Sequence, residues 1–145
     1  MNQISYQNAT SLHDYILEIS GGMSGIRDSG QLESTLIFVD DNEYYRSFEE
    51  KLCYLIYSIA TGHAFVDGNK RTSIALGGLL MFLNGYGDLV PYYFTFMEGL
   101  VLSLVERKIK REKFIEIIKF YISKGFLSEE HLLFMLEQRE KSVKQ

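Results

Sequence analysis

The residue types best suited to chemistry are concentrated in one stretch near the middle of the chain, which reads His63-Ala64-Phe65-Val66-Asp67-Gly68-Asn69-Lys70-Arg71-Thr72. An apolar helical pattern follows it, so a loop is predicted to enter a helix here. The first N–H groups of a helix lack internal partners and carry the positive end of its dipole. Gly68 lets a ligand approach the backbone closely, and Lys70 and Arg71 add positive charge. The stretch therefore predicts an anion site, for which phosphate is the natural ligand.

Two side chains of this stretch could act on a bound phosphate compound. Asp67 lies just before the backbone donors, and one carboxylate with phosphate oxygens and water is a common way to hold Mg²⁺. His63 could take a proton from an attacking hydroxyl, since imidazole titrates near neutral pH. Phe65 is expected to point into the core and to fix the loop, so that the polar residues on either side converge.

Each residue also has a simpler interpretation when it is taken alone. A lone histidine such as His63 is more often a hydrogen-bonded structural residue than a base. Asp67 and Gly68 alone would form a turn, and Lys70 and Arg71 would be a solvated first helical turn. Cations at that end of a helix are disfavoured by a few tenths of a kcal/mol, which favours the presence of an anion.

Two other motifs are excluded by spacing. A P-loop requires four residues between its two glycines, with Lys-Ser/Thr directly after the second, whereas five residues lie between Gly62 and Gly68, and Asn69 precedes the lysine. A zinc-protease helix requires two histidines four residues apart, which the three histidines of this chain cannot supply.

The elements that must position these residues are predicted to be helices. Apolar residues recur at three- and four-residue steps along most of the chain, and the segment from about Asn69 to Leu83 is apolar on every face. Ser47 and Thr95 each precede a glutamate by three residues, which predicts two helix starts. The expected fold is all-α, with about six to eight helices around a central helix and a small flap or hairpin near residues 20–30.

Composition limits the class of protein. The chain has 145 residues with 46% hydrophobic and 23% charged, which predicts a single domain over residues 1–145. The net charge of −4 argues against a nucleic-acid partner. The first residues do not resemble a secretory signal, and the densest apolar run, Ile74–Leu83, is about half of what a membrane span requires. We expect a cytoplasmic protein without a membrane partner.

The stretch from His63 to Arg71 resembles the signature of the Fic/Doc (Fido) family, H-x-F-x-[D/E]-[G/A]-N-[G/K]-R. The lysine variant is similar to the death-on-curing (Doc) toxin branch. Leu12-His13-Asp14 and the segment from Gly21 to Glu33 resemble the first helix and the flap region of Doc proteins. The resemblance covers residues 12 to about 87, and the rest matches only as further helices.

The resemblance implies transfer of part of a nucleotide, with ATP and Mg²⁺, to a hydroxyl of a target protein. His63 would be the base and Asp67 the metal ligand. The residues that would hold the nucleotide are Gly68, Asn69, Lys70 and Arg71, of which the last two also count among the catalytic residues. The flap residues that would align the target are Gly25, Ile26, Arg27 and Asp28.

Lys70 distinguishes between the reactions known in this family. AMP-transferring members have glycine there and often a second arginine where this chain has Ile74. The lysine variant occurs in Doc toxins that phosphorylate elongation factor Tu and stop translation, which favours a kinase-like phosphotransferase. The alternatives are an AMP transferase (protein adenylylation) and a non-catalytic module that binds a nucleotide or a partner.

Control of the activity is expected to come from another chain. Some Fic proteins block themselves with an internal helix that carries S/T-x-x-x-E-G/N, and this chain has no match to it. The nearest candidate, Glu98-Gly99, has Phe94 where serine or threonine is required. The resemblance to Doc therefore implies a small antitoxin whose disordered tail folds as a helix beside the active site.

Overall fold

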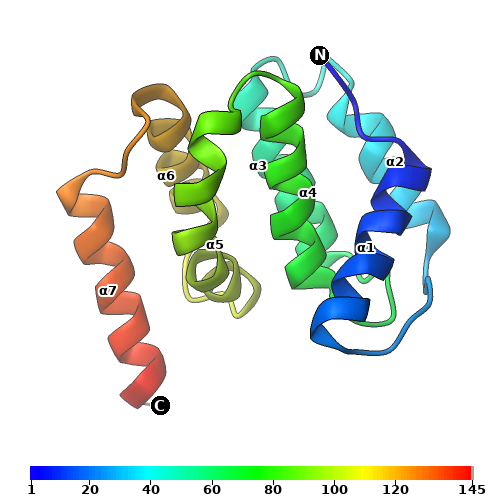
Figure 1. Ribbon diagram of the computed structural model, residues 1–145. Coiled ribbons are helices and arrows are strands. Elements are labelled where there is room, and N and C mark those ends of the chain that lie inside the picture. The colour runs from blue at the N-terminus through cyan, green and yellow to red at the C-terminus, as the bar shows by residue number, and fades with distance from the viewer. Residues whose placement is uncertain (145) are drawn as a thin grey trace.

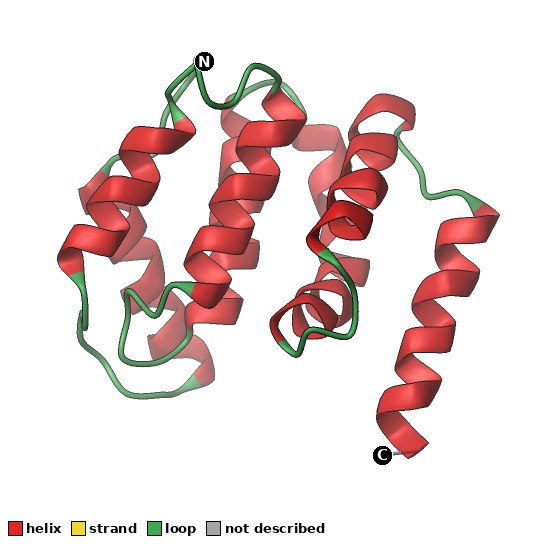
Figure 2. Ribbon diagram, turned by 180° about the vertical axis from the view of Figure 1, so that it is seen from behind, coloured by secondary structure: helices red, strands yellow, loops and turns green. Residues whose placement is uncertain are grey.

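The computed structural model describes residues 1–144, and the side chains through residue 141; Gln145, the end of the predicted domain, lies outside the described residues. The described chain forms seven α-helices and one 3₁₀ helix (Figures 1 and 2). The β pairing in the described residues is limited to one isolated antiparallel bridge, between Ile26 and Phe65. The all-α prediction is confirmed. The elements are α1 (Tyr6–Ser20), α2 (Ser29–Val39), α3 (Phe48–Thr61), α4 (Asn69–Leu83), η1 (Gly87–Leu89), α5 (Val90–Val105), α6 (Arg111–Lys124) and α7 (Glu129–Lys144).

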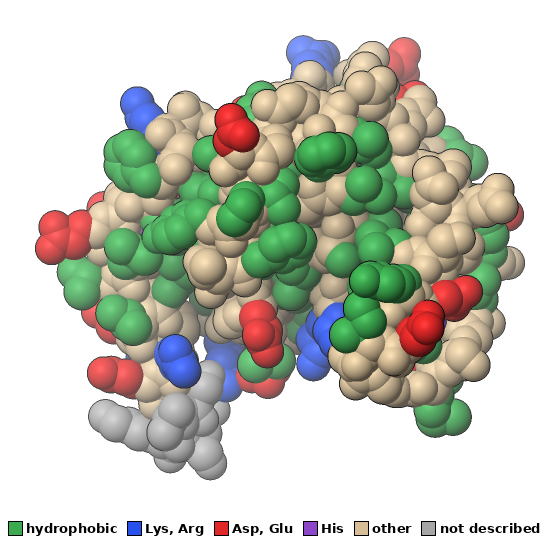
Figure 3. All heavy atoms as spheres, viewed as in Figure 1, with side chains coloured by type: hydrophobic (Ala, Val, Ile, Leu, Met, Phe, Trp, Pro, Cys, Tyr) green, Lys and Arg blue, Asp and Glu red, His purple; other side chains and the backbone are tan. Residues whose placement is uncertain are grey.

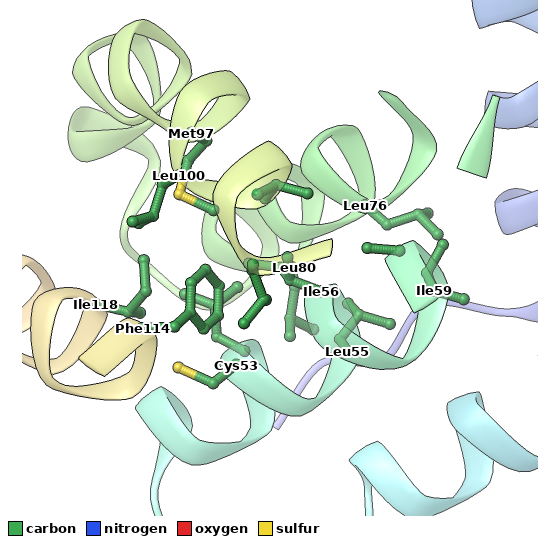
Figure 4. Close-up of a cluster of buried hydrophobic side chains, with 14 of the residues drawn as sticks. Cys53, Leu55, Ile56, Ile59, Leu76, Leu80, Met97, Leu100, Phe114 and Ile118 are labelled. Atoms are coloured by element: carbon green, nitrogen blue, oxygen red, sulfur yellow. The ribbon is translucent and has the colours of Figure 1, made fainter. Parts of the chain in front are cut away.

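The centre of the molecule is a pair of helices, α3 and α4, rather than one helix. Helix α4 packs against α1, α3 and α5, and α3 packs against α2 and α6 as well. Their facing side chains form the apolar core seen in Figure 4, with Leu55, Ile56 and Ile59 on α3 and Leu76 and Leu80 on α4, all at most 1% exposed. Helix α7 lies at the edge in both ribbon views and packs on α5.

Helix α4 is less completely buried than its sequence predicts. Phe82 is 68% exposed, so the expectation of an apolar contact on every face is wrong at this position. The buried face instead includes Gly77, where the absence of a side chain lets α5 come close. A Cβ on Gly77 would lie 2.3 Å from Tyr93 Oη and 2.9 Å from Ile56. The Tyr93 hydroxyl donates a hydrogen bond to the Ile74 carbonyl (2.9 Å), which joins α5 to α4.

One of the two predicted helix starts is confirmed and the other is wrong. Ser47 caps α3, with its Oγ accepting the Glu50 N–H (3.2 Å), while the Glu50 carboxylate accepts the Arg46 N–H (3.1 Å). Thr95 lies inside α5, where its hydroxyl donates to the Tyr92 carbonyl (2.6 Å). The helix begins earlier because Pro91 occupies its first turn, where a fixed φ and a missing N–H are both tolerated.

Whereas the prediction from sequence rests on Ile74–Leu83 alone, the helical stretch Gly87–Val105 is, among the described residues, long and apolar enough to cross a membrane by length and composition. Its mean hydropathy of 1.2 and its length meet the criterion for a span, although the core helix of a soluble protein meets it as well. One face of α5 packs in the core through Tyr93, Met97 and Val101. Hydrophobic side chains remain exposed over α4 and α5 (Figure 3), among them Phe82 and Phe94.

Gly77 in α4 and Gly99 in α5 provide a matched test of this packing. We expect Gly77→Ala to destabilise the protein by about 1–3 kcal/mol, because the new methyl group overlaps Tyr93 and Ile56. Gly99→Ala, in α5, meets nothing within 4 Å and should raise stability by about 0.5–1 kcal/mol through helix propensity. Thermal and urea unfolding of the two variants measure the difference, and equal effects would contradict the packing described here.

Candidate active site

The predicted catalytic and nucleotide-binding residues lie where the loop at residues 63–68 enters α4, beside the C-terminal end of α1 (Figure 1). Gly68 is the N-cap of α4, in the left-handed conformation (φ 78°), and provides no side-chain hydrogen bond. Helices α1, α2 and α3 are each capped by a side chain, from Ser5, Asp28 and Ser47. Helices α4, α5 and α6 begin without a side-chain cap, and at α4 this leaves the first N–H groups open to an anion.

The His63 imidazole is exposed and makes no hydrogen bond with the described part of the chain. Its backbone is left-handed (φ 55°), a conformation that among the described non-glycine residues only Arg107 shares. This conformation costs a non-glycine residue about 1–2 kcal/mol. The structure thus holds His63 in a strained position with both ring nitrogens available to a ligand, where a structural histidine would have partners.

The Asp67 carboxylate is fixed by backbone donors. Its Oδ2 accepts the Met23 N–H (3.1 Å) and its Oδ1 accepts the Gly68 N–H (2.7 Å). These two hydrogen bonds lower the pKa of Asp67 below its ordinary value, with a smaller contribution from the positive charge of Arg71. The side chain remains 46% exposed, so the ionised carboxylate is both oriented and accessible.

Lys70 and Arg71 differ in how far they are already engaged. The Arg71 guanidinium donates to the Ser20 hydroxyl and to the Gly21 carbonyl (2.9 Å), and its Nη2 lies 3.9 Å from Asp67 Oδ1. Arg71 thus ties α4 to the end of α1. The Lys70 side chain is exposed and has no hydrogen bond or ion pair within the described residues. Both residues lie at the start of α4, but Lys70 alone of the pair has an unoccupied charged group.

Asn69 has a structural task that the sequence did not indicate. Its Oδ1 accepts the Phe65 N–H (3.0 Å), and its Nδ2 donates to the Phe65 carbonyl (2.9 Å). The carboxamide therefore clamps the loop rather than pointing freely at a ligand. Phe65 itself is 0% exposed, which confirms that its ring packs in the core and fixes the loop.

Of the two predicted forms, a flap or a hairpin, the structure has the flap, an extended segment that pairs with the motif loop. Arg27 and Asp28 donate their N–H groups to the Ala64 carbonyl (2.8 and 3.0 Å), and Val66 donates to the Gly25 carbonyl (3.1 Å). Residues 29–30 already belong to α2, because the Asp28 side chain caps that helix. The structure therefore brings the predicted flap residues, Gly25 to Asp28, directly alongside the residues that precede Asp67.

Two supporting residues were not predicted as part of the site. His13, on α1, is 1% exposed, and its Nε2 lies 2.7 Å from the Asp67 carbonyl oxygen. Gln31, on α2, donates to the Ser58 carbonyl (3.1 Å) and packs so closely on Gly62 that a Cβ there would lie 2.0 Å from its Nε2. Long sequence separation hides both contacts; the similarity of Leu12-His13-Asp14 to Doc proteins was the signal available for His13.

The donor set suits a magnesium ion that arrives with phosphate. No cluster of three or more histidine, cysteine, aspartate or glutamate side chains occurs in the described part of the chain, as a metal site built from protein alone would require. Asp67 supplies one oriented, accessible carboxylate next to the open end of α4, which fits the usual binding of Mg²⁺ through one or two carboxylates and substrate phosphates. The two described cavities lie elsewhere: one of about 500 Å³ between α5 and α7, and one of about 290 Å³ near Lys51 and Tyr86.

Comparisons with known proteins match the part of the chain that forms this site. A family model described as "Fic/DOC family" matches residues 3–81, which is more than half of the chain. The chain is 36% identical to "Protein kinase doc" of Escherichia phage P1 over 91 residues, 60% of this chain and 70% of the phage protein. It is 35% identical to "Toxin Doc" of Mycolicibacterium smegmatis over 69 residues, 45% of this chain and about half (53%) of that protein.

The hydrogen bonds to Asp67 predict a pH-dependent contribution to stability. Because its pKa is lowered on folding, the carboxylate stabilises the native state above its ordinary pKa of 3.8, and this contribution is lost as the pH falls through the lowered value. Asp67→Asn should therefore reduce the free energy of unfolding at pH 7, and the difference from wild type should shrink toward pH 3. Urea unfolding at both pH values measures this; a difference that does not change with pH would show that the carboxylate charge is not stabilised by folding.

Proposed function

Because this chain belongs to the Fic/DOC family, and within it to the Doc branch, we propose that it is a Doc-like toxin that transfers the γ-phosphate of ATP to a hydroxyl of a target protein. The relatives are named as a protein kinase and a toxin, which supports both parts of the proposal. By resemblance, the proposed target is elongation factor Tu, and its modification would inhibit translation.

One observation carries the proposal: an unpartnered imidazole and an oriented carboxylate lie at the two ends of one short loop that enters an uncapped helix. His63 begins the loop and Asp67 ends it. Lys70 and the first N–H groups of α4 follow at once. Phosphoryl transfer depends mainly on positioning and on charge stabilisation, and this arrangement offers one base, one carboxylate and several cationic donors.

The chain's residues would act as follows. His63 takes the proton from the target hydroxyl while the hydroxyl oxygen forms a bond to the γ-phosphorus. The bond between the γ-phosphorus and the bridging oxygen breaks, and ADP leaves with that oxygen. Lys70, Arg71 and the N–H groups at the start of α4 hold the phosphate oxygens. Mg²⁺, when it is bound by Asp67 and the phosphates, would neutralise part of the phosphate charge. The flap would align the target segment beside His63.

Lys70 is the feature that favours γ-phosphate transfer over AMP transfer. Its side chain would occupy and charge a region that is open where AMP-transferring relatives have glycine, so the nucleotide should bind differently. In the alternative reaction, the target oxygen would attack the α-phosphorus and pyrophosphate would leave. A module that binds nucleotide without transfer is a further alternative, against which the unengaged His63 and the oriented Asp67 argue.

The proposal includes a cellular setting. A toxin that acts on the translation machinery would act in the cytoplasm. Its partner there would be a small antitoxin with a disordered tail that folds as a helix on this chain, since no internal inhibitory motif was found in the sequence.

Two labelled forms of ATP separate the candidate reactions. The purified protein, with Mg²⁺ and either a bacterial lysate or purified elongation factor Tu, should transfer label from γ-labelled ATP and none from α-labelled ATP. His63→Asn should lower the rate by about 10²- to 10⁴-fold, because the base is lost. Asparagine is chosen because it adopts the left-handed backbone more readily than most residues.

Each other result identifies a different function. Transfer of α-label would show AMP transfer, and nucleotide binding without transfer of either label would show a binding module. The His63 side chain is exposed and unpartnered, so the free energy of unfolding of His63→Asn, measured by thermal unfolding, should lie within about 0.5 kcal/mol of the wild-type value. A variant that keeps full activity would refute His63 as the base.

Toxicity can be tested in a growing bacterium. Controlled expression of the wild-type chain should stop growth, whereas expression of His63→Asn at the same level should not, because arrest requires transfer. Unrestrained growth with the wild-type chain would count against a toxin while leaving the transfer reaction to be judged by the labelled-ATP experiment.

A further inference from the structure

We infer that His13 is a positioning residue of the site, because it fixes the direction of the Asp67–Gly68 peptide and through it the orientation of the Asp67 carboxylate. Its effect on catalysis rests on the proposed function, whereas its effect on the loop does not. Nothing in the family signature at residues 63–71 includes this residue, which lies on a different helix.

His13 is held in one orientation by the groups around it. The ring is stacked on Phe65, with ring centroids 3.8 Å apart and an interplanar angle of 8°. Its Nδ1 lies 3.5 Å from the exposed carboxylate of Asp14, and its Nε2 lies 2.7 Å from the Asp67 carbonyl oxygen. A carbonyl oxygen only accepts hydrogen bonds, so Nε2 must carry a proton and donate it.

The geometry of the peptide bond transmits this contact to the carboxylate. In a trans peptide the C=O and the N–H point in opposite directions within one plane. With the Asp67 carbonyl turned toward His13, the Gly68 N–H points away from α1, and Asp67 Oδ1 accepts it (2.7 Å). The second oxygen then accepts the Met23 N–H (3.1 Å). Rotation of this peptide would remove one of the two hydrogen bonds that orient the carboxylate.

The packing around Gly68 leaves little room for another arrangement. A Cβ at Gly68 would lie 3.2 Å from Leu17 Cδ2 and 3.6 Å from His13 Nε2. The left-handed Gly68 therefore sits directly on α1, and the histidine is the polar group that α1 offers to this turn. An apolar aromatic residue at position 13 would pack against the Phe65 ring equally well, but it would leave the Asp67 carbonyl without a hydrogen-bond donor.

Two substitutions separate hydrogen bonding from packing. His13→Phe keeps an aromatic ring against Phe65 and removes the donor, whereas His13→Gln loses the ring and places an amide N–H near the position of Nε2. We expect the Gly68 amide to exchange about 10-fold faster with solvent in His13→Phe, from the loss of one hydrogen bond, and to change little in His13→Gln. NMR-detected hydrogen exchange measures this without any activity.

The same variants should differ in binding and in transfer. Loss of a group that orients a metal ligand typically costs about 10- to 100-fold in metal affinity or activity. We therefore expect His13→Phe to bind the Mg²⁺ complex of a non-hydrolysable ATP analogue about 10- to 100-fold more weakly than wild type. His13→Gln should stay within about 3-fold of wild type, because the donor is retained. Isothermal titration calorimetry measures the affinity, and the labelled-ATP experiment measures the rate.

Three results would overturn the inference. One is unchanged Gly68 exchange in a folded His13→Phe variant, and another is an equal effect of the two substitutions. The third needs no variant: a ¹⁵N spectrum of the wild-type imidazole that shows Nε2 without a proton would exclude donation to Asp67. If wild type transfers no label while Gly68 exchange separates the variants as expected, the proposed function fails and the role of His13 in the loop stands.

Discussion

The contact between the end of α1 and the loop at residues 63–68 is the constraint on which the site depends. That loop must bury Phe65 and present His63 and Asp67 within a few residues of it, which an isolated segment of this length cannot do. Helix α1 supplies the missing half of the structure: a donor to the Asp67 carbonyl, acceptors for the Arg71 guanidinium, and an N–H from the segment that follows it. The carboxylate and the start of α4 are therefore oriented before any ligand binds, which reduces the cost of ordering them later.

The rigidity of that contact comes from the packing of α3 and α4. The loop leaves the end of α3 and enters α4, and these two helices share the apolar centre of the molecule (Figure 4). Close approach at Gly77 and the hydrogen bond from Tyr93 to the Ile74 carbonyl join α5 to the same unit. Any movement of the loop relative to α4 would disturb a densely packed core, in which voids and overlaps are both costly. The strained backbone of His63 is tolerated because its neighbours on both sides are fixed in this way.

Local signals in the sequence predicted much of this structure, and contacts between distant segments account for the rest. The periodic apolar pattern gave the helices, and Ser47 marked the start of α3, because caps and periodicity depend on neighbouring residues. The spacing of Thr95 and Glu98 predicts a helix start that the structure does not have. The same spacing also occurs inside helices, and α5 already begins before Thr95, with Pro91 in its first turn. The sequence predicts the place of the flap but not its partner, because an extended segment does not show in its own sequence which backbone it will pair with. Asn69 and His13 were not recognised as clamps for the same reason: their partners are carbonyl and N–H groups, which every residue carries.

The structure also divides the motif into residues that hold the site and residues that remain available to a ligand. Asn69 is committed to the Phe65 backbone, whereas Arg71 donates to the end of α1 from Nη1 and, with its side chain 40% exposed, keeps further N–H donors for a phosphate. His63 and Lys70 have no such hydrogen bonds among the described residues; His63 precedes Asn69 in the sequence, and Lys70 lies between Asn69 and Arg71. An unpaired lysine beside the positive end of a helix is unfavourable until an anion neutralises both. A bound polyphosphate would neutralise both the Lys70 charge and the positive end of α4. The unfavourable interaction between them in the free protein would therefore become a favourable contribution to the binding free energy.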